Sequence, residues 1–234
     1  MDFIDLSHQD LTQAELSNLD LSHTNLANSN LYRAGLFKSN LYAANLQKAN
    51  LSHSYAIGLN LCDAKLNNAE VSYANLYQAN LIGADLRGAN LHGANLRGVD
   101  FGDMDVAFLS GANFQDVLYD LETNFPNGFD ISQFDAHFIG KNSNLQSANL
   151  HSAYLRNADL RHANLVHADL RNCSLQHADL RYANLNNANF DSFVDFSNAD
   201  LRHCDFSNTD LSQVLMDNTN FDESTKFPTD YIQP

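Results

Sequence analysis

A hydrophobic residue, nearly always Leu, stands at every fifth position over most of this chain. Between residues 6 and 101, seventeen of the twenty such centres are Leu, and the others are Ala56, Val71 and Phe101. Ala holds eleven of the twenty positions two residues before a centre, and Asn or Asp holds fifteen of the twenty directly before it. Ten more centres run from Leu145 to Phe190, and six follow after one inserted residue. The unit Ala-(Asn/Asp)-Leu-x-x therefore dominates the sequence.

The order small, polar, Leu places side chains alternately inward, outward and inward, as in a short strand. The two residues after each centre, here called the first and second corner positions, are polar or Gly and turn the chain. A chain that turns every five residues has to coil, and stacked coils pair through backbone hydrogen bonds about 4.8 Å apart. The string Ala158–Ala163 recurs at 178–183 and 199–204, at spacings of 20 and 21 residues. This spacing predicts four units in each coil.

These residues resemble the pentapeptide-repeat family over 4–118 and 143–224, which is most of the chain. The resemblance implies an all-β fold, a right-handed quadrilateral β-helix with about four pentapeptides per coil and roughly ten coils. The Leu-centred, Asn-rich form of the repeat is similar to that of proteins abundant in cyanobacteria.

The repeat is interrupted once, which predicts two solenoid blocks rather than one unbroken rod. Between Phe101 and Leu109 the register also slips by a number that is not a multiple of five, which indicates a bulge or a bent coil. The predicted parts are a first block at 1–118, an interruption at 119–143, a second block at 144–224 and a C-terminal cap or tail at 225–234.

A short motif follows the last repeat of each block. Thr123-Asn-Phe-Pro126 lies in the interruption, and Thr225-Lys-Phe-Pro228 begins the tail. Pro lacks the N–H that a further strand would need, so we interpret Thr-x-Phe-Pro as an end motif used twice. Residues 130–139 then predict a short helix, because Ile131, Phe134 and Phe138 would share one face.

The chain carries no recognisable catalytic or cofactor site. Seven of its ten histidines occupy the second corner position, and none would stack on another histidine one coil away, so no zinc site is expected. Cys173 and Cys204 replace Ala at small inward positions, and Cys62 points outward without a basic partner. No nucleophile accompanies a base and no Gly-rich phosphate loop occurs. We therefore expect a non-enzymatic protein without metal or cofactor.

Charge and hydropathy exclude further classes. The formal net charge is −15, which disfavours general binding to nucleic acid. No apolar run reaches the 18 residues of a membrane-spanning helix, and the acidic start at Met1–Asp5 has no signal-peptide core. Three cysteines make no disulfide framework and fit a reducing compartment, so a cytoplasmic protein away from membranes is expected.

Three functions remain open. A rigid solenoid suits a protein-binding or scaffold module of unidentified partner. The resemblance also implies a DNA mimic, because some family members resemble B-DNA in shape and charge and inhibit DNA gyrase; against this, residues 144–190 carry a net charge of +1. The third alternative is a structural rod without a localised site. The first coil has no obvious cap before Ile4, which adds self-association to the partners considered.

Two surfaces are candidates for binding. Large apolar residues replace polar ones at first corner positions of the first block, at 20-residue spacing in two neighbouring columns: Phe37, Ile57 and Tyr77, then Tyr42, Cys62 and Ile82. A contiguous apolar patch of this kind often marks an interface, although the rings could also simply shield the backbone. The second surface is a charged ladder in the second block, where we expect the two columns to neutralise one another rather than form a basic stripe: Asp159, Arg161, Asp179, Arg181, Asp200 and Arg202.

Overall fold

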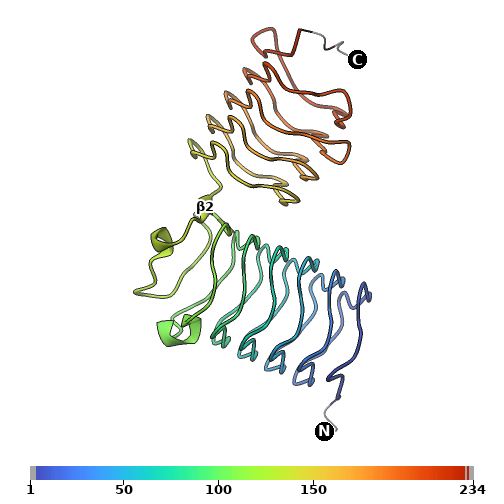
Figure 1. Cartoon of the computed structure of the whole chain (residues 1–234), viewed down its shortest axis with the longest axis vertical. Helices are drawn as coiled ribbons and strands as arrows, with labels where there is room; N and C mark the ends of the chain where they lie inside the picture. The colour runs from blue at the N-terminus through green and yellow to red at the C-terminus, as the bar shows by residue number, and fades with distance from the viewer. Residues whose placement is uncertain (1–3, 230, 232–234) are drawn as a thin grey trace. The chain divides into compact units, whose positions relative to one another are not determined.

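The computed structural model of this protein describes residues 4–229 and residue 231. The chain forms two compact units, Met1–Ala136 and His137–Pro234. Within each unit the backbone winds through successive coils of similar size, with a turn at every corner (Figure 1). Short strands and single turns of 3-10 helix occur only where the five-residue repeat is broken.

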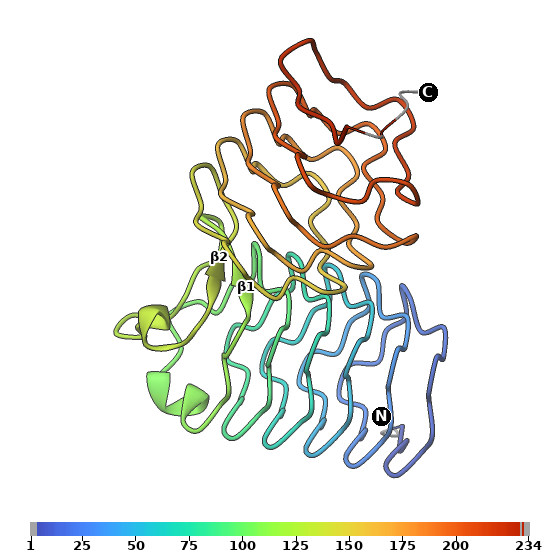
Figure 2. The same ribbon diagram turned by 45° about the horizontal axis from the view of Figure 1, so that its top comes forward.

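Parallel backbone bridges connect each coil to the next. In unit 1 the series starts with Asp5↔Asn25 and continues at every fifth residue with an offset of 20. Each regular coil therefore makes four bridges, each at the residue directly before a centre, which we call the bridge position. A second view shows how the backbone turns at the corners of each coil (Figure 2). The quadrilateral β-helix predicted from the repeat is confirmed.

Each corner is a tight turn in which the second corner residue has a positive φ. The N–H after the corner donates to the carbonyl of the centre, as from Ala34 to Leu31 (3.0 Å). Among non-glycine residues this φ lies between 52° at Lys38 and 64° at Tyr182, as in a type II turn. Asn and His adopt this left-handed conformation more readily than most residues. Backbone geometry therefore accounts for the many corner histidines.

Inward Leu and Ala side chains form the core of unit 1. All centres from Leu26 to Phe101 are buried. Ala56 and Leu59, where a small and a large residue exchange places, are both fully buried, so that volume lost at one position is restored nearby. The inward centres are less well covered in the first coil. There, at the outer end of the described chain, three centres are only partly buried: Leu6, Leu11 and Leu16.

The offset between coils departs from 20 residues in both units. In unit 1 it rises from 20 to 23 residues between the bridges Asn80↔Asp100 and Asn90↔Asn113. The 3-10 helix η1 (Val106–Leu109) takes up the additional length, and the side chain of Asp105 caps it by accepting from the Ala107 N–H. In unit 2 the offset rises from 20 to 21 at Ser174↔Asp195, which places the inserted residue just before this bridge.

The helix expected over residues 130–139 is wrong. One 3-10 turn, η2 (Ile131–Gln133), is capped by Asp130, and His137–Phe138 forms strand β2; the other short strand is β1 (Leu118–Tyr119). Phe129 and Phe134 flank η2 and both pack on the buried ring of Phe114, at centroid distances of 4.9 and 5.5 Å. With both rings anchored on one core side chain, the segment between them forms only this single 3-10 turn.

The two Thr-x-Phe-Pro segments make the same hydrogen bonds. The Thr123 hydroxyl donates to the carbonyl of Leu96 (3.0 Å) and accepts from the N–H of Asp120 (3.0 Å). In unit 2 the Thr225 hydroxyl donates to Leu201 (3.1 Å) and accepts from Asp222 (3.1 Å). Each Asp also accepts from a backbone N–H of the preceding coil, at 2.9 Å from Gly98 and 3.1 Å from His203. The end motif is therefore Asp-x-x-Thr-x-Phe-Pro.

The aromatic residues of the two end motifs also match. Phe125 stacks on Phe101 at 5.4 Å in unit 1, and Phe227 stacks on Phe206 at 6.0 Å in unit 2. A second ring four residues later covers the first, Phe129 at 5.4 Å and Tyr231 at 4.9 Å. Each motif thus lays two successive rings over the end of a Phe-rich core. In the described part of the chain, no helix is long and apolar enough to cross a membrane.

Candidate functional site

The first candidate surface is a corner of unit 1. The backbone bonds Lys38 N–H to Ile57 C=O (2.9 Å) and Gly58 N–H to Tyr77 C=O (2.9 Å) place Phe37, Ile57 and Tyr77 on successive coils. Equivalent bonds align the second column. We call these six residues the apolar corner: Phe37, Ile57, Tyr77, Tyr42, Cys62 and Ile82.

The two columns differ in exposure. Ile57 is buried between its half-buried neighbours Phe37 and Tyr77, whereas Tyr42 and Ile82 expose 39% and 41% of their surface. Cys62 lies half-buried between them, and burial raises the pKa of its thiol. The second column is therefore the part of the apolar corner that a partner could reach, while the first column is largely packed.

One aromatic residue that the sequence analysis did not assign to the apolar corner extends this surface. Tyr55 occupies a bridge position, where Asn is usual, and exposes 45% of its surface beside Phe37, with ring centroids 6.1 Å apart. An aromatic residue at a position where the repeat usually has Asn was the sequence signal that could have identified it. Cations border the first column: Lys38 lies over the Phe37 ring at 5.1 Å, and Arg97 lies over the Tyr77 ring at 5.3 Å.

Arg97 also ties this column to the end motif of unit 1. Its side chain is buried and pairs with the Asp120 carboxylate at 3.3 Å. Asp120 is the residue that accepts from Gly98 in the end motif. Tyr77 thus covers a buried ion pair, and replacing it would disturb the fold as well as the surface.

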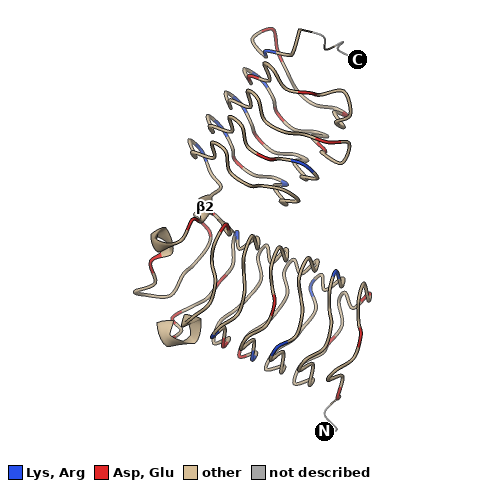
Figure 3. Cartoon of the chain, in the orientation of Figure 1, with Lys and Arg blue, Asp and Glu red and all other residues tan. Residues whose placement is uncertain are grey.

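The charged ladder of unit 2 forms a continuous zigzag of ion pairs. Each of the three arginines, Arg161, Arg181 and Arg202, donates two hydrogen bonds of 2.6–2.9 Å to the carboxylate of the Asp two residues earlier. The guanidinium groups of Arg161 and Arg181 also reach the Asp of the next coil, Asp179 at 3.6 Å and Asp200 at 3.7 Å. Acidic and basic positions accordingly lie close together in successive coils of unit 2 (Figure 3).

The hydrogen bonds from the guanidinium groups hold the pKa values of Asp159 and Asp200 below their usual range. Because the folded pKa is depressed, the stabilisation is present at neutral pH and is lost as the pH falls through the folded pKa. Every Arg of the ladder has an acidic partner, so the geometry presents paired charges rather than a bare basic stripe.

Removing the three guanidinium groups is therefore expected to change stability little and DNA binding not at all. Solvent-exposed ion pairs contribute little to stability, so the triple variant Arg161→Gln, Arg181→Gln, Arg202→Gln should melt slightly below wild type. Thermal melts and fluorescence anisotropy with labelled duplex DNA measure both quantities. Salt-sensitive DNA binding by wild type that the variant loses would contradict this expectation.

Aromatic rings stack beside the ladder. His162, Tyr182 and His203 follow one another on successive coils, with centroid distances of 4.8 and 4.3 Å and nearly parallel planes. His203 also pairs with Asp222 of the end motif at 3.2 Å. Among residues 4–229 and 231, no three His, Cys, Asp or Glu side chains gather closely enough to hold a metal ion. Cys173 and Cys204 are buried, and desolvation raises the pKa of both thiols.

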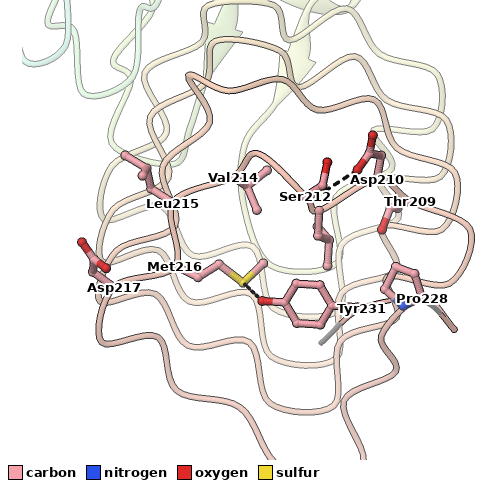
Figure 4. A pocket seen from close by; sticks show the side chains of 10 residues that line it. Thr209, Asp210, Ser212, Val214, Leu215, Met216, Asp217, Pro228 and Tyr231 are labelled. Atoms are coloured by element: carbon pink, nitrogen blue, oxygen red, sulfur yellow. Dashed lines mark hydrogen bonds between the residues drawn. The ribbon is translucent and has the colours of Figure 1, made fainter. Parts of the chain in front are cut away.

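A hollow of about 700 Å³ lies at the end of unit 2. Met216 and Tyr231 lie next to each other in its lining, and the tyrosine hydroxyl donates to the Met216 sulfur at 3.4 Å (Figure 4). Its remaining lining is mixed, with Val214, Leu215 and Asp210 among the residues around the rim. No pair of groups in it has the arrangement of a nucleophile and a base.

Comparison with known proteins identifies the repeat. A family model for pentapeptide repeats, with 8 copies, matches residues 1–36, 44–81, 71–103, 141–161, 153–191 and 195–225. These segments cover more than half of the chain. No curated protein matches the chain.

Several solved structures, two of them described as pentapeptide-repeat proteins, are similar to this chain. HetL, involved in heterocyst differentiation regulation in the cyanobacterium Nostoc sp. strain PCC 7120, is 26% identical, with 93% of this chain and 89% of HetL covered and a TM-score of 0.43. Rfr23 from the cyanobacterium Cyanothece 51142 is 20% identical, with 82% and 90% covered and a TM-score of 0.28. QnrB1, a plasmid-mediated fluoroquinolone resistance protein, is 17% identical, with 94% and 91% covered and a TM-score of 0.27.

Proposed function

Because the chain belongs to the pentapeptide-repeat family, whose right-handed quadrilateral β-helix it forms, we propose that it is a non-enzymatic module that binds a protein partner through unit 1. The observation that supports this proposal is the apolar corner together with Tyr55. Three of these residues, Tyr42, Tyr55 and Ile82, remain between 39% and 45% exposed at corner and bridge positions that polar residues usually occupy. Large side chains, and aromatic ones above all, supply most of the binding energy at protein interfaces.

The surrounding coils favour a rigid docking surface. The bridge positions of this side carry an amide ladder, with Asn60 donating to Asn40 at 2.8 Å and Asn40 donating to Asp20 at 2.9 Å. Satisfied amides hold the flanking backbone in place, so binding would cost little ordering of the protein. A side chain that only shielded the backbone would be buried, as Ile57 is. Tyr42 is instead exposed.

The test replaces exposed residues and leaves the packed column intact. We expect the triple variant Tyr42→Ser, Tyr55→Ser, Ile82→Ser to lose the partners that wild type captures from an extract of its native host, with an unchanged melting temperature. The matched control is Phe108→Ser, Tyr182→Ser, Phe193→Ser, whose members are likewise exposed but lie outside the corner. If both variants capture the same proteins as wild type, the apolar corner is not the functional surface.

A DNA mimic that inhibits gyrase-like enzymes is the second candidate, and the net charge of −15 favours it. The ion-paired ladder argues against it, because a mimic of the phosphate backbone needs unpaired negative charge along its length. A gyrase supercoiling assay separates the two candidates, since inhibition by the purified chain would support mimicry. A structural rod, the third alternative, predicts neither captured partners nor inhibition.

A further inference from the structure

Among the described residues, the first coil of unit 1 forms the end of the stack and has a partly apolar centre. Ile4 and Leu19 expose 52% and 44% of their surface there, and the three centres of this coil that precede Leu21 are only partly buried. The four bridge positions around this end are all acidic: Asp5, Asp10, Glu15 and Asp20. The bridge positions of the next two coils contain no acidic residue, and residues 1–32 contain no Lys or Arg.

Among the described residues, the backbone of these four residues forms an edge without a pairing partner. One coil higher, Asn25 donates its N–H to Ile4 (2.9 Å) and accepts from the N–H of Leu6 (2.7 Å). Asp5 holds the same place in the first coil, where its N–H and C=O point away from Asn25. Within residues 4–229, the backbone N–H and C=O groups of the four acidic residues have no hydrogen-bond partner. Such an edge is a template for pairing with another chain.

The side chains at the bridge positions also change from amides to carboxylates in the first coil. Asn45 donates its amide to the Asn25 oxygen at 3.0 Å, and Asn25 donates to the Asp5 carboxylate at 3.0 Å. An amide both donates and accepts, whereas an ionised carboxylate only accepts. The ladder can therefore continue past an Asn, but it ends at Asp5. Ser7 and Thr12 donate to Asp5 and Asp10, and these bonds lower the pKa of both carboxyls, which stay ionised at neutral pH.

We propose that the first coil is a self-association face for a second copy of this chain. In the wild type, repulsion between the rings formed by Asp5, Asp10, Glu15 and Asp20 prevents two copies from docking through it. A four-sided edge fits another four-sided edge of the same spacing, and the first coil of a second copy supplies one. If a two-fold axis relates two such ends, the acidic ring of one copy lies against the acidic ring of the other, with carboxylates about 5 Å apart. Like charges at that separation oppose the contact, in the way that charged edge strands prevent sheet-to-sheet aggregation.

The experiment neutralises the ring with the closest isosteres. We expect Asp5→Asn, Asp10→Asn, Glu15→Gln, Asp20→Asn to form a dimer, with a doubling of the molar mass in sedimentation velocity and light scattering at concentrations where wild type shows none. The amides keep the acceptor atoms that Ser7 and Asn25 use, so the coil should remain folded. If the fourfold variant melts early, the double variant Asp10→Asn, Asp20→Asn carries the same test with a smaller shift.

A matched control separates position from net charge. Asp63→Asn, Glu122→Gln, Asp217→Asn, Glu223→Gln removes the same four charges from exposed sites elsewhere and should keep the wild-type mass. Adding Leu19→Lys to the ring variant should restore that mass, because it places a charge on the open end. A ring variant that stays at the wild-type mass, a control that also dimerises, or a dimer that survives Leu19→Lys would each overturn the proposal. The readout is independent of the apolar corner.

Discussion

Replacing Leu86 by Asp in unit 1, or Leu165 by Asp in unit 2, is expected to unfold the coils around the substitution. Both side chains are essentially fully buried in a column of Leu and Ala. The carboxylate would have no partner there, and an uncompensated buried charge costs about 3–5 kcal/mol. Because each coil contacts only its neighbours, the loss should spread from the altered coil through the unit that contains it.

Circular dichroism melts of the two variants measure this effect. The control is Leu121→Asp, which makes the same chemical change at a side chain that is 90% exposed, and it should melt with wild type. Melts of Leu86→Asp and Leu165→Asp that coincide with the control would mean that these residues do not line a dry core.

Removing one hydroxyl from either end motif is expected to give the second largest effect. Thr225→Val keeps the shape of a buried side chain but leaves the Asp222 N–H without its partner and removes one of the two hydrogen bonds to the Leu201 carbonyl, which still accepts from the Cys204 N–H. The unsatisfied N–H costs about 1–3 kcal/mol where water cannot replace the bond. Thr123→Val should act alike on Leu96 and Asp120, with a smaller cost because Thr123 is only half-buried.

Urea titrations followed by fluorescence of the Tyr residues report the change in unfolding free energy. Thr229→Val, at an exposed site next to the second motif, is the matched control. Equal midpoints for Thr225→Val and this control would show that the hydroxyl does not close the end of unit 2.

The repeat predicted the regular coils because each of its positions has one physical task. A residue at the small position must fit inside, one at the centre must fill the core, and one at the second corner must accept a positive φ. Even the exchange at Ala56 and Leu59 could be recognised, since core volume has to be conserved.

Segments outside the repeat were harder to predict, because tertiary packing decides their structure. Residues 130–139 have helical periodicity, yet Phe129 and Phe134 are both held by Phe114 and only η2 forms. The Asp of each end motif was overlooked because Asp is common throughout the repeat, so that its position three residues before Thr carried no visible signal. The exposure of Tyr42 relative to Ile57 depends on neighbouring side chains and could not be read from spacing.

The bridges between coils also constrain how such a gene can change in length. Every regular bridge joins residues 20 apart, so deletion or duplication of twenty codons returns each side chain to its own column. A change of five codons keeps every residue in its role as centre, corner or bridge but moves all later columns to the next side of the solenoid. An apolar corner could thus be transferred from one face to another by a single short insertion. The shift from 20 to 21 at Ser174↔Asp195 is a different event, a single added codon that the loop between two centres absorbed without moving a column.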